Sequence, residues 1–455
     1  MASMDTARPA RLSFPALIGF ATPGFAIGAL SVAIGVYLPN YYAAQLGLPL
    51  AVVGAAFGMV RLFDSVLDPV LGALMDQSRT RLGRYRPWLM AGAPVLMVAV
   101  FMLFDPPAGA TKLYLFGWLA LYYLGLSLSV LSHVSWASGI AGQYNERSRL
   151  FGAIQFIAVV GATLILLPPI LLAKAGGARA AVPPMGWGIV LAVPVGALLA
   201  ILSAREPIAA STHEDRLSWR DYVAILSRAD VLRIAVADFC LTLGPGWMSA
   251  LYLFYFHDLR GFSLASASSL LGLYIAAGLF GAPAFSWLAI RIGKHRALMV
   301  ASTAYSLGLL LLPLIPRGAY PLAALSMVFQ GFLAASFAML DRAMMGDVGD
   351  AIRLEQGKRR VGLLFAMITT AQKFGTAFSI TLSYAALGWV GYQARHDVVN
   401  TPAAIAGLQW VYLTGPIVFV MLGGACFIGW RLDSTRHARI LADLETRDAL
   451  EASAA

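Results

Sequence analysis

Two aspartates, Asp64 and Asp68, lie one helical turn apart inside an apolar stretch, 52–74, that is long enough to cross a bilayer. The spacing places both carboxylates on one helix face, and Arg61, three residues before Asp64, joins them there. At roughly 6 Å and an effective dielectric constant near 20, two ionised carboxylates repel each other by about 3 kcal/mol. A bound cation, a proton or a neighbouring positive charge must therefore compensate them. Ionisable groups at membrane depth usually belong to an ion or substrate pathway, and a structural Arg–Asp pair is the alternative.

The composition indicates a protein that crosses a membrane many times. Of the 455 residues, 59% are hydrophobic and 12% are charged, and the mean hydropathy is +0.74. This leaves too little polar surface for a soluble domain of this length. The net charge of +10 comes from basic residues in short connections between apolar runs, which indicates membrane topology and not binding of nucleic acid. Cys240 and Cys426 lie in apolar segments, so neither a disulfide nor a cysteine metal site is expected.

Runs of about 20 apolar residues bounded by charges, Pro or Gly predict about twelve transmembrane helices. We place them at 14–43, 51–76, 87–104, 112–141, 149–173, 183–203, 231–257, 264–290, 297–316, 320–344, 360–388 and 403–430. The first run has no clear cleavage site and is kept in the mature protein. Arg and Lys concentrate in alternate connections, which marks those connections as cytoplasmic, so both termini are expected in the cytoplasm.

A basic turn occurs twice in the same register. Arg81-Leu-Gly-Arg-Tyr-Arg86 follows the second run, and Arg291-Ile-Gly-Lys-His-Arg296 follows the eighth, 210 residues later. A repeat after six spans indicates two parallel six-helix halves, as in major-facilitator transporters. We therefore predict an all-α membrane protein with the major-facilitator fold and about twelve transmembrane helices. Its parts are an N-terminal half at 1–203, a cytoplasmic linker at 204–230, a C-terminal half at 231–431 and a cytoplasmic tail at 432–455.

The acid pair belongs to one half only. The residues 210 positions beyond Asp64 and Asp68 are Tyr274 and Gly278. An asymmetric charge on a repeated framework indicates function and not architecture. Tyr274 is a candidate for the lining of a substrate cavity, with core packing as the alternative.

Four stretches and one lysine match a single pattern. They are Arg61-Leu-Phe-Asp-Ser-Val-Leu-Asp-Pro69, Gly83-Arg-Tyr-Arg-Pro-Trp88, Tyr144-Asn-Glu-Arg-Ser-Arg-Leu150, Gly346-Asp-Val-Gly-Asp350 with Gly357-Lys-Arg-Arg-Val-Gly362, and Lys373. In these residues the chain resembles the glycoside-pentoside-hexuronide:cation symporters, the melibiose permease group, over essentially its whole length. The resemblance implies a secondary active transporter that carries a sugar, a glycoside or another small organic solute together with Na+ or H+ by alternating access.

The resemblance also implies which residues couple the ion to the solute. In that family the two acids of the second span bind Na+, Li+ or H+, and their matches here are Asp64 and Asp68. Lys373 matches the lysine of the eleventh span, and it would place a positive charge near the same cavity. Arg61 is a second positive charge toward which the acids can turn when the ion leaves. The coupling ion, a small solute and the lipid bilayer are the implied partners, without another cofactor, and the protein is expected to work as a monomer.

The charged sugar contacts of that family are missing from this chain. Their positions match Gly24, approximately Val130, and Gln155, which are all uncharged. His133 lies near a position where relatives often have Tyr, and Trp136 lies near a sugar-stacking aromatic. Core packing is the alternative for both. The altered positions leave a second cargo open, an amphipathic or hydrophobic solute moved by symport or by proton antiport.

Charged residues of the basic connections are predicted to form ion pairs that act together as a cytoplasmic gate. They are Asp76, Arg84, Arg86, Glu146, Arg147, Arg296, Asp347, Asp350 and Arg359. A single screened surface pair contributes little, so such a gate needs several pairs. Asp238, near the start of the seventh run, is predicted to be an interfacial cap or a gate partner.

A membrane enzyme is the other class of function that the chain could have. Such an enzyme needs a clustered nucleophile, base or metal set. The chain contains neither an HExxH nor a GxSxG motif, and its six histidines are scattered. We therefore predict a transporter and not an enzyme.

Overall fold

The computed structural model describes residues 12–140, 144–204, 206, 227–356, 361–395 and 398–454. Every element named in this part of the chain is a helix. Twelve helical segments are long and apolar enough to cross a membrane, which confirms the predicted all-α membrane protein. These segments are Phe14–Gln45, Leu50–Met75, Arg86–Phe104, Lys112–Ile140, Arg149–Leu172, Gly177–Ser203, Ala229–Leu259, Leu264–Ile292, Lys294–Leu314, Tyr320–Glu355, Leu363–Trp389 and Pro402–Ala425.

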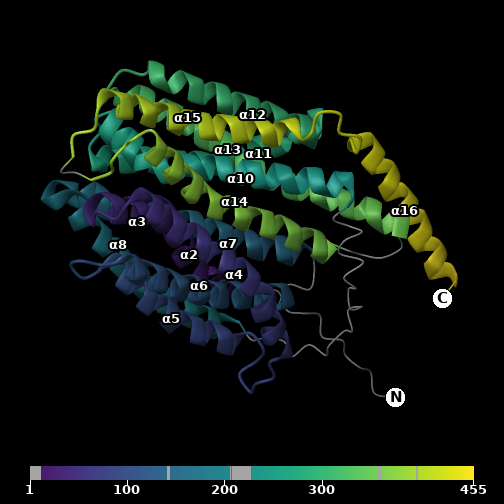
Figure 1. Ribbon diagram of the computed structural model, residues 1–455. Helices are drawn as coiled ribbons and strands as arrows, with labels where there is room; N and C mark the ends of the chain where they lie inside the picture. The colour runs from purple at the N-terminus through teal and green to yellow at the C-terminus, as the bar shows by residue number, and fades with distance from the viewer. Residues whose placement is uncertain are drawn as a thin grey trace. The chain divides into compact units, whose positions relative to one another are not determined.

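The helices cluster into two compact units, apart from short segments at 263–268 and 394–398 that cluster with the first. The first unit, purple to blue in Figure 1, contains α1 (Phe14–Ala21), α2 (Pro23–Val32), η1 (Ala33–Tyr37), α3 (Leu38–Asn40), η2 (Tyr41–Gln45), α4 (Leu50–Gln77), α5 (Arg86–Phe104), α6 (Lys112–Ile140), α7 (Tyr144–Leu164) and α8 (Leu167–Ser203). The second, teal to yellow, contains α10 (Ala229–Leu253), η3 (Phe254–Leu259), α11 (Leu264–Ile292), α12 (Lys294–Leu311), η4 (Leu312–Leu314), α13 (Tyr320–Gln356), α14 (Val361–Trp389), α15 (Pro402–Ala425) and α16 (Ser434–Ala454).

The same helix pairs form in each unit. In the first unit α2 packs against α7 and α8, and α5 packs against α6 and α8. Six spans later, α10 packs against α14 and α15, and α12 packs against α13 and α15. Five helices of each unit thus share one arrangement, which agrees with the repeated halves that the basic turn predicts.

Helix α13 is longer than the sequence predicts. The tenth span was expected to end at 344, but the helix continues through the charged residues to Gln356. Charged residues lower the local hydropathy and so end the apolar run. They do not end the helix, because Asp, Arg and Glu are tolerated in helix interiors. Asp347 and Asp350 therefore lie on the last turns of a helix and not in a connecting loop.

The close approach of α2 and α7 depends on glycine. Gly24 and Gly28, one turn apart on α2, face the carbonyl oxygens of Ile154 and Ala158 on α7. A Cβ added at Gly24 would lie 2.6 Å from the first oxygen, and one added at Gly28 would lie 1.8 Å from the second. Small residues at this spacing let two membrane helices pack backbone against backbone. The first span is therefore held tightly against the fifth.

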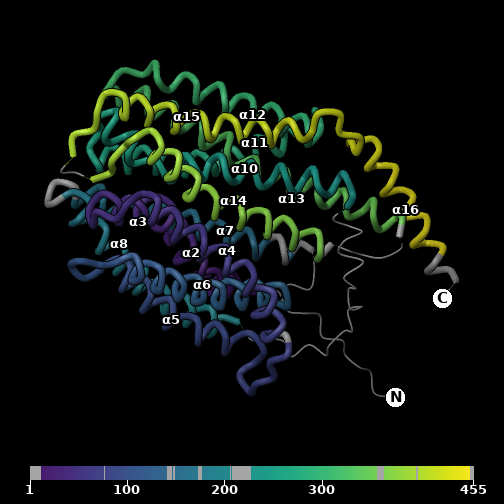
Figure 2. Tube along the Cα trace, viewed as in Figure 1, coloured from purple at the N-terminus to yellow at the C-terminus, as the bar shows by residue number. Residues whose placement is uncertain are grey.

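Helix α16 forms in the tail, where charged residues alternate with apolar ones at helical spacing. Its apolar residues Ile440 and Leu444 pack against Ala351 on the last turns of α13. Figure 2 shows this yellow helix beside the end of α13. The amphipathic tail is thus part of the second unit.

Candidate cation-coupling site

Helix α4 brings Arg61 and Asp64 together, and α6 supplies their other partners. Asp64 is 2% exposed. Its Oδ2 accepts a hydrogen bond from Nη1 of Arg61 at 3.1 Å, and its Oδ1 accepts one from Oγ of Ser127 at 2.6 Å. The guanidinium of Arg61 also lies over the ring of Tyr123, 4.9 Å from its centroid. The charge of Asp64 is therefore balanced by a cation and a hydroxyl donor within the first unit.

Such a balance is a physical requirement at this depth. The desolvation penalty of a buried carboxylate is several kcal/mol, and only a close positive charge with good hydrogen bonds offsets it. Arg61 provides that charge, and its own side chain is 18% exposed. A cation that reaches Asp64 could take over this role while the ring of Tyr123 continues to hold the guanidinium.

Asp68 lies one turn further along α4 and is half-buried. Pro69 follows it inside the helix. Because Pro has no backbone N–H, it cannot donate the usual helical hydrogen bond to the carbonyl of Ser65. A carbonyl oxygen therefore lies between the two acids on the helix, and such oxygens are ligands for hard cations.

Lys373 belongs to the second unit. It lies on α14 and is half-buried. The residue before it, Gln372, contacts side chains of both α10 and α13. The neighbourhood of Lys373 is therefore tied to two other helices of its unit.

His133 and Trp136 lie in the interior of the first unit, and both are 0% exposed. Nε2 of His133 is 2.8 Å from the carbonyl oxygen of Phe20, and the two rings lie 4.8 Å apart. Trp136 packs edge-on against Phe20, and the guanidinium of Arg86 lies over the Trp136 ring, 5.3 Å from its centroid. Of the two interpretations that the sequence allowed for these residues, this environment favours packing.

The other predicted cavity residues have different surroundings. Gly24 faces the backbone of α7, where a larger side chain would collide with Ile154, and its predicted place in a cavity stays a prediction. Val130 is half-buried on α6, and Gln155 is exposed on α7. Tyr274 is half-buried on α11 in the second unit. No charge stands at any of the three positions that match the missing sugar contacts.

Three predicted gate residues of the first unit, Arg84, Arg86 and Glu146, make contacts inside that unit. Arg86 donates to two carbonyl oxygens at the end of α8, at 2.5 and 2.7 Å. The backbone N–H groups of Arg84 and Arg86 donate to the carboxylate of Glu206 at 2.8 and 3.2 Å. Glu146 pairs with Arg149 at 3.5 Å. The role of Glu206 was not predicted, since it depends on a contact across more than a hundred residues of sequence.

Two predicted gate residues of the second unit, Asp347 and Asp350, connect α13 to its neighbours. Asp347 pairs with Lys294 of α12 at 2.6 Å, and Asp350 pairs with His437 of α16 at 3.0 Å. Arg296 is exposed on α12. Arg359 and the side chains of Asp76 and Arg147 lie outside the described residues. The tail helix is thus fastened to α13 by charge as well as by apolar packing.

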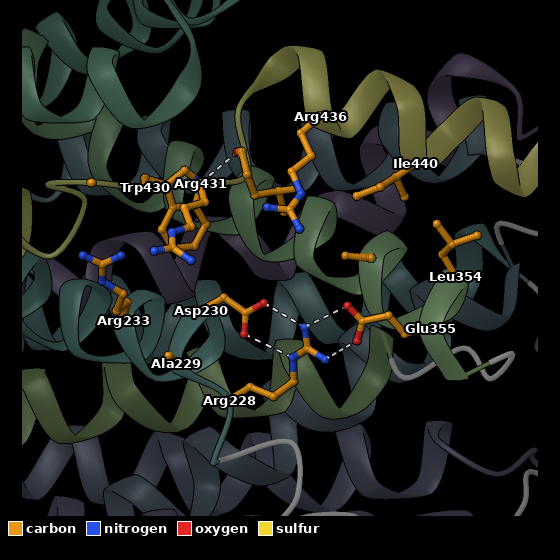
Figure 3. Close-up of a pocket in the computed structure, with 13 residues that line it drawn as sticks. Arg228, Ala229, Asp230, Arg233, Leu354, Glu355, Trp430, Arg431, Arg436 and Ile440 are labelled. Carbon is orange, nitrogen blue, oxygen red and sulfur yellow. Dashed lines mark hydrogen bonds and ion pairs between the residues drawn. The ribbon is translucent and has the colours of Figure 1, made fainter.

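Arg228, just before α10, lies between two carboxylates. Its guanidinium pairs with Asp230 at 3.0 Å and with Glu355 at 2.5 Å, as Figure 3 shows. Hydrogen bonds to these acids raise the pKa of Arg228 above its ordinary value, so the arginine stays charged. The three residues line one side of a cavity of about 740 Å³, and Arg431 lies on another side.

We expect Arg228→Gln to lower stability by about 1 kcal/mol, because two carboxylates lose a partner that solvent only partly screens. Arg431→Gln is the matched control: it makes the same change in the same cavity, where the described residues include no ion pair to Arg431. Melting temperatures in detergent at low and high salt would measure the difference, which should shrink as salt rises. Equal melting temperatures for the two variants would contradict the expectation.

The second unit contains a buried acid pair, Asp238 and Asp341, of which the sequence predicted a role only for Asp238. Asp238 was expected at the membrane interface, but it lies more than two turns inside α10 and is 1% exposed. Asp341 on α13 is 0% exposed. It is an acid inside an apolar run, which is the signal that identified Asp64, so the same test could have found it.

The comparisons with known proteins agree with this architecture. The chain is 24% identical to the uncharacterized symporter YnaJ of Bacillus subtilis (strain 168), with 96% of each chain covered. It is 24% identical to the isoprimeverose transporter of Lactiplantibacillus pentosus, with 92% of this chain and 88% of that protein covered. The crystal structure of the nucleoside transporter NupG shares the fold, with a TM-score of 0.68 at 13% identity over 92% of this chain and 98% of that one.

Fold and comparisons together define a multi-pass membrane transporter of the major-facilitator type. Residues 19–434 match the family described as MFS/sugar transport protein, and the chain belongs to that family. The predicted membership in the glycoside-pentoside-hexuronide:cation symporter group is confirmed by the relatives found.

Proposed function

We propose that the protein is a symporter of the bacterial inner membrane that couples Na+ or H+ to the movement of a sugar, a glycoside or another small organic solute. Both termini lie in the cytoplasm, and transport follows alternating access. The observation that carries the proposal is the buried carboxylate of Asp64, balanced by Arg61 at 3.1 Å, one turn before a second acid. The similarity to an isoprimeverose transporter supports a sugar-like solute.

Asp64 and Asp68 are the proposed coupling residues. Without the ion, Arg61 and Ser127 hold the carboxylate of Asp64. An incoming Na+ or H+ competes with Arg61 for that carboxylate and also neutralises part of the charge of Asp68. If the ion is Na+, the two carboxylates are its ligands, with the carbonyl of Ser65 placed between them. When the ion leaves, Asp64 pairs with Arg61 again. Ion binding therefore changes the net charge of α4. Lys373 on α14 is the proposed positive charge that senses this change.

Uptake into reconstituted vesicles with imposed Na+ or H+ gradients tests the coupling site. We expect Asp64→Asn and Asp68→Asn each to reduce uptake to the rate measured without a gradient, while exchange of solute at equal concentrations on both sides continues. The reason is that an amide cannot carry the charge for which the cation competes. Asp105→Asn, the same change at an exposed position of the first unit, should retain gradient-driven uptake.

Gradient-driven uptake that is unchanged in both α4 variants would remove the coupling role from these acids. Loss of folded protein in these variants, checked by gel filtration in detergent, would instead show that the two acids have a structural role.

An amphipathic or hydrophobic solute is the second candidate cargo. It is favoured by the uncharged residues Gly24, Val130 and Gln155 at the positions that match sugar-contacting charges. A thermal-shift screen of the purified protein against sugars, glycosides and amphipaths, each with and without Na+, would decide between the two. Stabilisation by a glycoside that increases with Na+ supports the first candidate, and stabilisation only by amphipaths supports the second.

A further inference from the structure

The buried acid pair of the second unit lies where α10, α13 and α14 pack together. Asp341 is 0% exposed and Asp238 is 1% exposed. The two carboxyl groups are close enough to act on each other electrostatically. They are therefore two potential negative charges in the buried interior of one unit.

Hydrogen-bond donors reach only one of the four carboxyl oxygens among the described residues. Nε2 of Gln372 donates to Oδ1 of Asp238 at 3.1 Å, and Gln372 is in turn held by Nη2 of Arg342 at 3.2 Å. Oδ2 of Asp238 and both oxygens of Asp341 accept no hydrogen bond from this part of the chain. Asp64 differs, since each of its oxygens has a donor at 3.1 Å or less.

A pair of carboxyl groups in this setting has one low-energy form. Two adjacent ionised carboxylates repel each other, and burial without donors adds the full desolvation penalty of each charge. One proton removes one of the charges and with it the repulsion between the two groups and part of the desolvation penalty. A metal cation fits less well, because it needs several more oxygen ligands and would lie near Arg342, whose charge acts on Asp238.

We propose that Asp341 and Asp238 form a proton-binding site in the second half of the protein. The pair takes one proton from a hydronium ion of the solvent, leaving a water molecule, and its charge falls from two negative charges to one. Release of the proton to water restores the second charge. The role of this proton in transport rests on the proposed function: Gln372, which holds Asp238, directly precedes Lys373 on α14, so protonation changes the charge beside the proposed coupling lysine.

Among the described residues, other charged groups lie near the pair. Arg342 of α13 acts on Asp238, and Asp341 itself acts on the thiol of Cys426 after α15. Arg233 of α10 acts on Cys426. On the remaining helices packed against α13, Lys294 of α12 is engaged by Asp347, and His437 of α16 is engaged by Asp350.

Infrared difference spectroscopy of the purified, reconstituted protein detects this proton directly. At neutral pH we expect the wild type to show the C=O stretch of a protonated carboxyl group, which shifts on exchange into D2O. In Asp341→Asn this band should be weaker by the absorbance of one carboxyl group. Asn resembles a protonated Asp in size, so the variant should keep its melting temperature. Asp443→Asn, the same change at an exposed position of α16, should leave the band unchanged.

Asp238→Asn is the second variant, and it keeps the test decisive if Asp341→Asn does not fold, since loss of either partner should change the same band. A spectrum identical to that of the wild type in the variants that fold would overturn the proposal. Absence of any protonated-carboxyl band from the wild type at neutral pH would overturn it as well.

Uptake in vesicles separates this proposal from the proposed function. Solute exchange should depend on pH in the wild type, and this dependence should be smaller in Asp341→Asn. A spectral change at Asp341 in a protein that moves no solute would support the proton site and contradict the transport function. Gradient-driven uptake that depends on Asp64, together with an unchanged spectrum in Asp341→Asn, would overturn the proton site alone.

Discussion

Arg61→Gln should destabilise the protein by about 3–5 kcal/mol, because it takes the guanidinium of Arg61 away from the buried carboxylate of Asp64. The side chain of Asp64 is 1% exposed. The hydroxyl of Ser127, which stays after the change, is a neutral donor. One neutral hydrogen bond contributes about 1 kcal/mol, which is well below the cost of the unpaired charge.

The double variant Arg61→Gln/Asp64→Asn should recover most of the lost stability, because it removes the charge that Arg61 compensates. Unfolding in detergent, followed by circular dichroism, gives all four corners of this mutant cycle. Arg81→Gln is the control, since Arg81 is exposed in the connection after α4 and its loss should change stability little. A double variant as unstable as Arg61→Gln would show that Arg61 stabilises the helix by packing and not by pairing with Asp64.

Gly28→Ala should also be severely destabilising, although it adds a single methyl group. The new Cβ would lie 1.8 Å from the carbonyl oxygen of Ala158, so α2 and α7 must separate along their contact. Overpacking of a rigid site costs about 1–3 kcal/mol and occasionally more, and a backbone atom has no alternative rotamer with which to avoid the collision.

Gly188→Ala is the matched control for this change. Gly188 lies inside α8, is exposed, and would place its Cβ in open space. There the same substitution should stabilise the helix by about 0.4–1 kcal/mol, because alanine restricts the unfolded chain more than glycine does. Opposite shifts of the two melting temperatures are the expected result. An unchanged melting temperature in Gly28→Ala would show that the helices tolerate the added methyl group at α2.

Much of the fold could be predicted because the signals for membrane helices are local. Hydropathy over about 20 residues locates a span without knowledge of its neighbours. The order Arg81-Leu-Gly-Arg-Tyr-Arg86 and its copy at 291–296 indicated two six-helix halves. The end of α13 could not be predicted in this way, because the hydropathy signal stops at the membrane boundary while the helix continues to Gln356.

The candidate sites divide along the same line. The proximity of Arg61 and Asp64 follows from a spacing of three residues on one helix, so the sequence predicts it. Ser127 and Tyr123 complete that environment from α6, 63 and 62 residues away, and no local pattern identifies them. For His133 the sequence allowed both packing and contact with solute, and its burial against Phe20 favours packing.

The sequence by itself determined the class of protein, its twelve spans and the helix that carries the acid pair, because composition and spacing along one helix are properties of the chain alone. Tertiary structure decided which charges are compensated. Asp64 is paired and bonded through both oxygens, whereas Asp341 and Asp238 act on each other from two helices that lie about a hundred residues apart in the sequence. The physical reason is that the energy of a buried charge depends on the few groups within hydrogen-bonding distance, and the packing of distant helices selects those groups.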